Sequence, residues 1–379
     1  MRRAVLSYPL IRKELKEGKS VQEVARKYNV TRQAIYWHIY KNKKKKRGRK
    51  RRYKKNYNCL IDWRVYNEGL VKRGEFLLDI DFLKKNFKRE LRELNRGKGG
   101  RPFKYPNSFI LFFLRLKCVF KIDYRTLEGI ARKLVVFIGM DMKAPDYTTF
   151  QVRAARLNYK FEVYERMDEQ EIAGDASGLK ATNRGEYRWR KHGGKRKEFL
   201  KLHLAVNTRN RQILYCKVTT ERVRDGKELP DMIREAKSYG RINTGIFDAG
   251  YDSWKNYYLL VRNHIIPAIR PRRSMTLSKV RKEKMQVLGK LQKKGENERL
   301  IGRYVRLKVL EEFLADEDCW KKRHGFGRRW IVEGRYSVFK RIFSENLYSK
   351  RLKNIKCEVM IKVGLLNLFT YHLRNAFKW

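Results

Sequence analysis

The chain has 379 residues, of which 93 are Lys or Arg and 40 are Asp or Glu, and its formal net charge at pH 7 is +53. This excess of positive charge exceeds what solubility requires and predicts a polyanionic partner, with nucleic acid as the default and a membrane surface as the rival. The sequence has no apolar run long enough to span a bilayer and no hydrophobic leader segment, so we expect a soluble intracellular protein without a membrane role.

The five cysteines are far apart and form no CxxC pair, and the six histidines show no paired spacing. These patterns exclude the usual zinc motifs and predict reduced thiols in a reducing compartment. The length allows two or three domains, and 42% hydrophobic residues are enough to build their cores.

Residues 1–41 are expected to form a helix-turn-helix domain. Apolar residues recur there at helical spacing, and Asn29 interrupts them where a tight turn belongs. Ser20 and Thr31 are placed to cap the two helices. The second helix would present polar side chains to a DNA major groove, namely Arg32, Gln33 and Tyr36. The alternative is a small helical bundle whose charged face is only solvated.

Residues 42–57 are expected to be a basic linker. The segment KNKKKKRGRKRRYKKNY holds almost nothing apolar, so it cannot pack a core. Arg47 and Arg49 flank a glycine and could lie in a DNA minor groove, where a narrow A·T tract concentrates negative potential. A solvated linker or an electrostatic tether is an equally consistent interpretation.

Residues 58–165 show helical periodicity, interrupted by the glycine-rich basic loop GKGGRPFKYP at 97–106. This loop is not a phosphate-binding P-loop, because it lacks the GxxxxGK[ST] spacing. The helical region is expected to contact DNA or to mediate dimerisation, and its sequence alone does not choose between the two.

Residues 166–379 change to a pattern of strands and helices. Three strand-like runs, EIAGDASGLK, EFLKLHLAVNT and RQILYCKVTT, are followed by alternating helix and strand patterns, which predicts an α/β fold with a mixed sheet covered by helices. A charged, helix-prone stretch at about 271–325 has too few apolar residues for a large core of its own and is expected to be an insertion.

Three separated acids stand out in this basic background. Asp175 lies within an apolar strand, Asp248 closes another, and Glu333 lies in a basic helix. Carboxylates gathered against a polyanion are suited to bind divalent metal ions, and two such ions can activate a nucleophile and stabilise a leaving oxygen at a phosphodiester. Arg329 and Lys340 flank Glu333 at one and two helical turns, where they could bind phosphates. Alternatively, Arg329 and Glu333 form only an ion pair on an exposed helix.

These residues resemble the DDE transposases of bacterial and archaeal insertion sequences. The likeness is to the IS-four and IS-five branch, whose last motif reads Tyr-x2-Arg-x3-Glu-x6-Lys. Here the motif is Phe326-x2-Arg329-x3-Glu333-x6-Lys340, with the spacing kept and Phe in place of Tyr. The blocks GDASGL and FDAGYDS, which contain the two aspartates, are also similar, and the resemblance covers about residues 58–375.

The resemblance implies an RNase H-like catalytic core for residues 166–379, in which Asp175, Asp248 and Glu333 are catalytic and hold two Mg²⁺ or Mn²⁺ ions. One site would then cut DNA strands and join a 3′-hydroxyl to a target. The DNA contacts expected near the cut are Arg329, Lys340, Lys191, His192, Lys201 and Phe326. Phe326 lacks the hydroxyl of tyrosine, so only base stacking is expected of it.

The implied partners are double-stranded DNA, as transposon ends and as target, and a second copy of the chain in a homodimer, with no small-molecule substrate. The implied location is the nucleoid in a prokaryotic cytoplasm. Two alternatives stay open, namely a DNA-binding repressor derived from a transposase and an RNase H-fold nuclease that cuts without joining.

Overall fold

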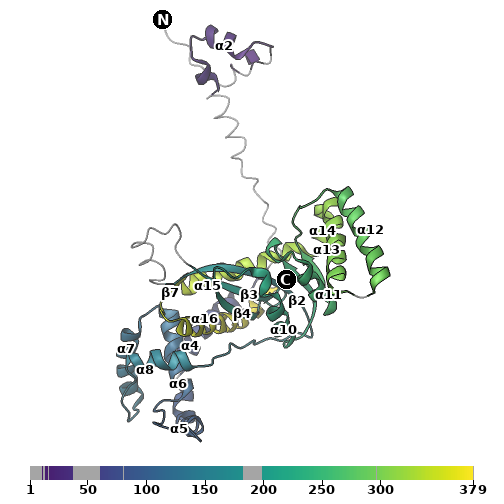
Figure 1. Cartoon of the computed structure of the whole chain (residues 1–379). Helices are drawn as coiled ribbons and strands as arrows, with labels where there is room; N and C mark the ends of the chain where they lie inside the picture. The colour runs from purple at the N-terminus through teal and green to yellow at the C-terminus, as the bar shows by residue number, and fades with distance from the viewer. Residues whose placement is uncertain are drawn as a thin grey trace, which may run out of the picture. The chain divides into compact units, whose positions relative to one another are not determined.

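The computed structural model describes residues 11–36 apart from 12 and 16, followed by 60–79, 81–181, 199–295 and 297–378. The chain divides into two compact units, one of Met1–Leu60 with Lys378–Trp379 and one of Ile61–Phe377 (Figure 1). The predicted linker lies outside the described residues, as do four predicted DNA contacts, Arg47, Arg49, Lys191 and His192. No helix in the described ranges has both the length and the apolar character needed to cross a membrane.

In the described part of the first unit, residues 11, 13–15, 21–27 and 32–36 are helical, and the last two of these segments flank a turn. Helix α2 (Val21–Lys27) begins after Ser20, whose hydroxyl accepts a hydrogen bond from the Glu23 amide while the Glu23 carboxylate accepts one from the Ser20 amide. The chain then turns at Asn29, where φ is 48°, and residues 32–36 are helical. A small apolar cluster holds this unit together, made of Ile11, Val24, Ala25 and Ile35. The predicted N-cap and turn are therefore confirmed.

The second helix of this unit exposes the side chains that were predicted to read bases. It begins after Thr31, whose side-chain oxygen accepts a hydrogen bond from the Ala34 amide (3.3 Å), as the sequence predicted. Arg32, Gln33 and Tyr36 are all exposed. These side chains are accessible to DNA, while the DNA-binding role itself stays a prediction.

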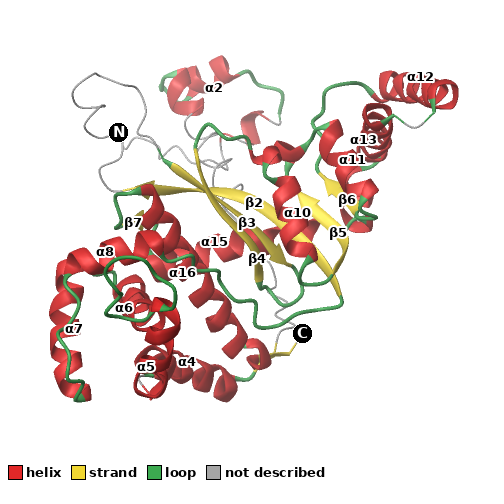
Figure 2. Ribbon diagram, turned by 60° about the horizontal axis from the view of Figure 1, so that its bottom comes forward, coloured by secondary structure: helices red, strands yellow, loops and turns green. Residues whose placement is uncertain are grey.

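A six-stranded mixed sheet forms the centre of the second unit (Figure 2). Its strands are β2 (Glu169–Ala181), β3 (Leu200–Asn207), β4 (Ile213–Thr220), β5 (Arg241–Phe247), β6 (Ile266–Ile269) and the short β7 (Asn346–Leu347). The order is β4-β3-β2-β5-β6, and β7 pairs with the end of β2. Strands β2, β3 and β4 are antiparallel, whereas β5 and β6 run parallel to β2. The predicted α/β fold with a mixed sheet covered by helices is confirmed, and its assignment as an RNase H-like core stays a prediction.

Helices cover both faces of this sheet (Figure 2). Helices α10 (Leu229–Lys237) and α11 (Trp254–Arg262) pack on one face, and α15 (Trp330–Phe343) and α16 (Leu352–His372) pack on the other. Each face has its own buried apolar cluster. Because successive side chains of a strand point to opposite faces, β2 and β3 contribute alternate residues to the two clusters.

The predicted helical region contains α4 (Trp63–Leu78), α5 (Asp81–Asn95), α6 (Asn107–Phe120), α7 (Tyr124–Ile138) and α8 (Tyr147–Arg156). The side chains of Asp62, Asp123 and Asp146 cap α4, α7 and α8. Helices α6 and α8 pack on α16, so this region shares a core with one face of the sheet.

The predicted charged insertion forms α12 (Leu277–Lys294), α13 (Glu298–Ala315) and α14 (Glu317–Arg323). Its own buried cluster is small, as its low apolar content predicted, and consists of Val280, Val287, Leu307 and Leu310. Arg306 of α13 donates to both carboxylate oxygens of Asp252 (2.7 and 2.8 Å), which fixes α13 beside the segment after β5. The remaining described elements are the 3-10 helices η1 (Asp225–Lys227), η2 (Ala249–Tyr251), η3 (Phe326–Arg329) and η4 (Arg374–Ala376), and a two-stranded sheet of β1 (Leu60–Ile61) and β8 (Phe377–Lys378).

Candidate active site

The alternation of strand β2 directs Asp175 toward helix α15. Asp175 pairs with Leu204 of β3, whose side chain lies in the cluster beneath α15 and α16, and directly paired residues point to the same face. The Asp175 side chain is only 20% exposed, and its Oδ1 accepts a hydrogen bond from the Ala176 amide (2.8 Å). A carboxylate that is partly buried in a sheet is costly unless other groups compensate its charge.

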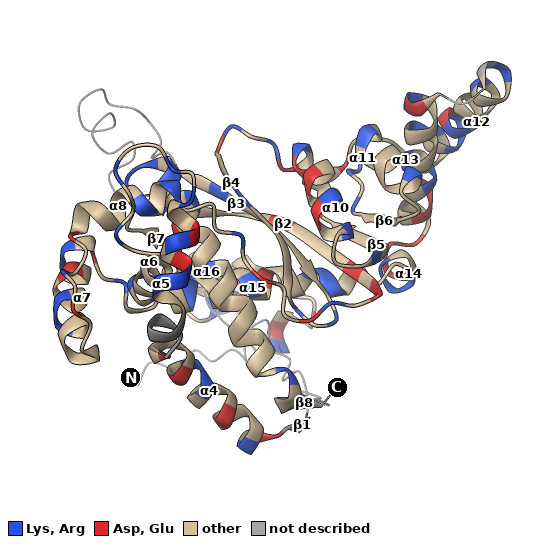
Figure 3. Cartoon of the chain, turned by 90° about the horizontal axis from the view of Figure 1, so that it is seen from below, with Lys and Arg blue, Asp and Glu red and all other residues tan. Residues whose placement is uncertain are grey.

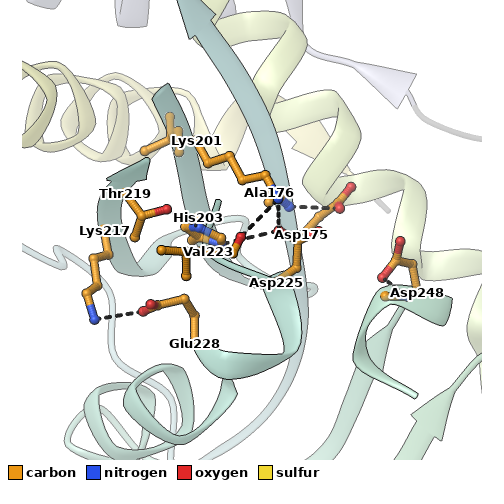
Figure 4. Close-up of polar contacts among 12 residues, drawn as sticks. Asp175, Ala176, Lys201, His203, Lys217, Thr219, Val223, Asp225, Glu228 and Asp248 are labelled. Atoms are coloured by element: carbon orange, nitrogen blue, oxygen red, sulfur yellow. Dashed lines mark hydrogen bonds and ion pairs between the residues drawn. The ribbon is translucent and has the colours of Figure 1, made fainter. Parts of the chain in front are cut away.

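Asp248 follows β5, the strand next to β2. Because Gly174 pairs with Phe247, the residues that come next, Asp175 and Asp248, stand at the same level of two neighbouring parallel strands. Asp248 caps η2, and its Oδ1 accepts a hydrogen bond from the Gly250 amide (2.9 Å). This bond holds the carboxylate at the carboxyl end of β5, which is where open α/β sheets commonly bind their ligands. Figure 4 shows Asp175 and Asp248 on these two strands.

Glu333 reaches the same place from helix α15. Arg329, one turn earlier, donates to a Glu333 oxygen and through its other terminal nitrogen to Asp175 Oδ2 (3.4 Å). One guanidinium therefore bridges strand β2 and helix α15. The Glu333 side chain is 53% exposed, whereas that of Arg329 is 24% exposed. The predicted ion pair between Arg329 and Glu333 is present. It is not an isolated surface pair, because the same guanidinium also pairs with the partly buried Asp175.

The charges of the three acids act on one another. Burial is the main reason why the pKa of Asp175 is raised to about 6, against the opposing effect of the hydrogen bond from Ala176. The negative charges of Asp248 and Glu333 raise this pKa further, and the positive charge of Arg329 lowers it. Asp175 therefore lies within electrostatic range of both Asp248 and Glu333, the other two acids predicted to form the site, and that site itself stays a prediction.

The donors at this site suit a hard divalent cation. Carboxylate oxygens are the ligands that Mg²⁺ and Mn²⁺ prefer. In the part of the chain that the structure describes, no three His, Cys, Asp or Glu side chains are gathered closely enough to hold a metal ion. The arrangement is instead an acidic site in which one arginine supplies the compensating positive charge.

A fourth carboxylate, Asp225, flanks the site and was missed by the sequence analysis. A Cβ atom on Gly250 would lie 2.9 Å from Asp248 Oδ1 and 3.6 Å from Asp225 Oδ2, so both carboxylates approach this glycine. The other oxygen of Asp225 accepts a hydrogen bond from the Lys201 ammonium (3.0 Å), as Figure 4 shows. The local sequence ERVRDGK is typical of a solvated turn, so it carried no signal for this position.

Two buried polar atoms beside these carboxylates lack partners. The Tyr251 hydroxyl is fully buried and has no hydrogen-bond partner among the described residues. Burial is the main cause that raises the pKa of Tyr251, and the charges of Asp175, Asp225 and Asp248 raise it further. His203 Nδ1 is also unbonded within the described ranges and lies 4.0 Å from Asp225 Oδ1. Atoms of this kind fit a site that takes up a bound group.

Lys201 is engaged inside the protein. Its ammonium donates to the Val223 carbonyl (3.0 Å) and to Asp225. Lys201 follows Leu200 and precedes Leu202, both of which lie in the cluster on the Asp175 face, so its side chain leaves the opposite face of the sheet. Its predicted DNA contact stays a prediction, and it would require the ion pair with Asp225 to be shared or broken.

Phe326 and Lys340 occupy different surroundings. The Phe326 ring packs against Trp320, with ring centroids 5.3 Å apart, and contacts both apolar clusters. Phe326 therefore has a packing role that its predicted stacking on a base did not include. Lys340 is half-buried on α15, and no described carboxylate lies within 4.0 Å of its ammonium. Its charge is thus available for a phosphate, and both predicted DNA contacts stay predictions.

Comparisons with known proteins point to one family. Residues 166–368 match the family model described as a transposase DDE domain, and residues 71–184 match a second model with the same description. The first match includes all three acids. Among solved structures, the Drosophila P element transposase strand transfer complex is similar over 76% of this chain and 85% of that chain, with 12% sequence identity and a TM-score of 0.29. A TM-score this low does not establish a shared fold.

Proposed function

The chain belongs to the DDE transposase family, and from this membership we propose that it cuts DNA at the ends of a mobile element and joins those ends to a target. The observation that carries the proposal is that Asp175 stands at the level of Asp248 on the neighbouring strand and shares Arg329 with Glu333. The negative charges of Asp248 and Glu333 both act on Asp175. Acids so placed inside a chain of net charge +53 fit chemistry on a polyanion.

We propose that Asp175, Asp248 and Glu333 hold two divalent ions, Mg²⁺ or Mn²⁺. When bound, such ions lower the pKa of an attacking water or 3′-hydroxyl and stabilise the departing oxygen. Arg329 now compensates the charge of Asp175 and Glu333. Cations bound by these acids would take over that compensation, so that Arg329 could turn to a DNA phosphate. Lys340, two turns along the same helix from Glu333, would bind a second phosphate.

The recognition of element ends is proposed for the first unit. Arg32, Gln33 and Tyr36 are exposed on a helix that begins after a turn, the arrangement in which a second helix reads a major groove. The basic segment 42–57, with Arg47 and Arg49, would follow the phosphate backbone into a minor groove. Two copies of the chain, one for each end, would make up the assembly that acts.

The test is a cleavage and strand-transfer assay with the full chain. The substrate is duplex DNA from the sequence that flanks the gene, with Mg²⁺ or Mn²⁺ added. Asp175→Asn, Asp248→Asn and Glu333→Gln each keep the size of the side chain and remove its charge, and each should lower the rate at least about 10²-fold. The matched control is Asp231→Asn, which removes a carboxylate from a surface ion pair on α10.

Each outcome decides between functions. Cutting and joining by the wild type, lost in the three site variants and kept in the control, supports a transposase. Cutting without joining of a 3′-hydroxyl end would indicate a nuclease. Specific binding of the ends without any metal-dependent cutting would indicate a repressor.

A further inference from the structure

A basic groove lies in the helical region, on elements other than those that carry the three acids. It is a cavity of about 640 Å³ between the loop after α5, helix α7 and the start of α8. We define the basic groove by six of the cations that line it, Lys98, Arg101, Lys104, Lys143, Arg153 and Arg156. It includes the glycine-rich loop at 97–106, to which the sequence analysis could assign no role. Figure 3 shows the charged residues of these helices.

The cations of the basic groove are not neutralised by the protein. Among the described residues, none of the six has a carboxylate oxygen within 4.0 Å of its charged nitrogens. Arg101, Lys104, Lys143 and Arg156 are exposed. Surface cations elsewhere in the second unit are frequently paired, as Arg281 and Lys284 are with Glu311. An unpaired group of this size raises the local potential and attracts anions.

The two acids that line the basic groove are already engaged. Glu128 accepts hydrogen bonds from Arg132 and from the Tyr147 amide (2.9 Å). Asp146 caps α8, and its Oδ1 accepts a hydrogen bond from the Thr149 amide (2.6 Å). Their negative charge is therefore used inside the protein, and the lining keeps a large positive excess.

The walls of the basic groove are held in place by local bonds. Asn95 and the backbone of Phe103 exchange two hydrogen bonds (2.7 and 2.9 Å), which closes the glycine-rich loop. Two cations lie over the Phe103 ring, Lys98 at 4.5 Å and Arg153 at 4.4 Å from the ring centroid. Tyr105 donates to the Lys143 carbonyl (2.8 Å) and so ties the loop to the segment before α8.

Arg153 is the buried cation of this wall. It is 6% exposed, and its two terminal nitrogens donate to the Tyr105 carbonyl and to Asn107 Oδ1, both at 2.6 Å. Both hydrogen-bond acceptors are neutral, and burial lowers the pKa of Arg153 while the more distant charge of Glu90 raises it, so an approaching anion would stabilise this guanidinium. The protein thus holds one buried positive charge beside four exposed ones.

From these contacts we infer that the basic groove binds the phosphate backbone of double-stranded DNA. This inference rests on the proposed function for the identity of the anion. Cations spread along the loop after α5, the segment before α8 and the last turn of α8 suit successive phosphates of one strand better than a single small anion. Such contacts position a duplex without reading its sequence, so the basic groove would hold DNA while the first unit selects the ends.

The test compares two sets of four neutralised cations in the full chain. The groove variant is R101A/K104A/K143A/R156A. The matched control is K279A/K282A/K290A/K293A, which removes the same charge from exposed lysines of α12 that have no carboxylate oxygen within 4.0 Å among the described residues. Binding to a duplex of unrelated sequence is measured between 50 and 300 mM salt. Each lost phosphate contact should reduce the slope of log K against log salt by about 0.9, so the groove variant should lose about 3 to 4 units of slope. The control should lose less than about 1 unit.

Three results would overturn the inference. The first is an equal loss of salt slope in the groove variant and in the α12 control, when the thermal unfolding of both proteins matches that of the wild type. The second is a groove variant that binds DNA like the wild type. The third is displacement of DNA from the wild type by micromolar inorganic phosphate or ATP, which would assign the groove to a small anion. If the wild-type protein binds DNA through the basic groove but does not cut it with Mg²⁺ or Mn²⁺, the inference on the groove holds and the proposed function is wrong.

Discussion

The hydroxyl of Tyr336 lies 2.6 Å from the backbone carbonyl of Asp175 and donates a hydrogen bond to it. The same hydroxyl lies 2.9 Å from the Leu202 carbonyl on β3. Tyr336 stands three residues after Glu333 on α15, so this bond fixes the distance between the helix that carries one acid and the strand that carries another. Burial raises the pKa of Tyr336 well above its usual value, so the hydroxyl stays a donor across the physiological range.

Replacing Tyr336 with phenylalanine should remove the hydrogen bond between helix α15 and strand β2 while the ring continues to fill its place in the core. Tyr336→Phe keeps the ring, which is 6% exposed, and removes only the donor. We expect a loss of about 1 to 2 kcal/mol in the free energy of unfolding, because two buried carbonyls lose a partner. We also expect cleavage to slow by more than this stability change explains, since Glu333 loses its fixed position.

Urea denaturation and a single-turnover cleavage assay measure the two effects. Tyr304→Phe is the control, because the described residues offer no hydrogen-bond partner to the Tyr304 hydroxyl. A Tyr336→Phe protein that cuts DNA at the wild-type rate would show that the hydrogen bond supports the fold but not the site.

Gly250 is the second place where a small change should act on the site alone. Gly250 leaves no room for a side chain, because a Cβ atom at this residue would lie 2.9 Å from Asp248 Oδ1. Gly250→Ala should force the Asp248 carboxylate to rotate, which would break its bond to the amide of residue 250. Cleavage should fall at least about 10-fold, because catalytic groups must be held within about half an ångström of their working positions.

The matched control for this change is Gly289→Ala on α12, where a Cβ would meet nothing within 4 Å. That variant should cut normally and gain up to about 1 kcal/mol of stability, as a helical glycine with open space for a Cβ does on replacement by alanine. The melting temperature of Gly250→Ala should stay near that of the wild type. An unchanged cleavage rate in Gly250→Ala would argue that the orientation of Asp248 is not critical.

The sequence predicted the parts of the fold whose signals are local. The alternation of apolar residues marked β2, β3 and β4, and the Ser20 cap marked the start of α2. Asp175 and Asp248 were placed correctly because each lies in or directly after a strand that the pattern identified. Glu333 was supported by Arg329 one turn before it, a relationship that depends only on helical spacing.

The remaining features depend on which strands become neighbours. Asp225 comes to lie near Gly250 and Asp248 because β4 returns along β3 and leaves η1 beside η2, a pairing that no local pattern states. Lys201 was expected in the DNA groove, yet strand alternation turns it away from the Asp175 face and toward Asp225. The bond from Tyr336 to Asp175 depends on the rotation of α15 about its axis, which hydrophobic spacing fixes only coarsely.

Glu358 provides a stability prediction away from the site. Its carboxylate is 5% exposed and accepts hydrogen bonds from Lys362 (2.7 Å) and the Ser349 amide (2.9 Å), and Lys117 lies 3.9 Å away. Glu358→Gln would leave two lysines buried without a negative partner. We expect the free energy of unfolding to fall by about 3 to 5 kcal/mol.

Chemical denaturation measures this loss, and Glu345→Gln is the control. Glu345 pairs with Lys180 on the surface, where ion pairs contribute little, so no measurable change is expected there. Glu358→Met is informative as well, because it also removes the charge but fills the space with an apolar chain. A small effect of Glu358→Gln would mean that water or a shifted pKa of the lysines compensates the missing charge.

Glu14 should make the stability of the first unit depend on pH. Its carboxylate accepts hydrogen bonds from Lys19 (2.6 Å), Lys27 (2.5 Å) and the Tyr28 hydroxyl (3.1 Å), and the bonds to Lys19 and Lys27 are the main causes that lower its pKa to about 2. In the unfolded chain the pKa is near its usual value of about 4.5. The unfolded form therefore binds the proton more tightly, so the stabilising contribution is complete above pH about 4.5 and is lost as the pH falls toward about 2.

Hydrogen exchange of the amides in residues 20–36, corrected for intrinsic rates, follows this unit within the full chain. In the wild type, protection should decline as the pH is lowered from 5 to 3. Glu14→Gln should show low protection already at pH 7 and little further change on acidification. Glu17→Gln should behave like the wild type, because among the described residues the exposed Glu17 carboxylate pairs with Lys19 alone (3.3 Å). Parallel pH profiles for the wild type and Glu14→Gln would mean that another carboxylate controls the unit, since the pH dependence must disappear with the group that causes it.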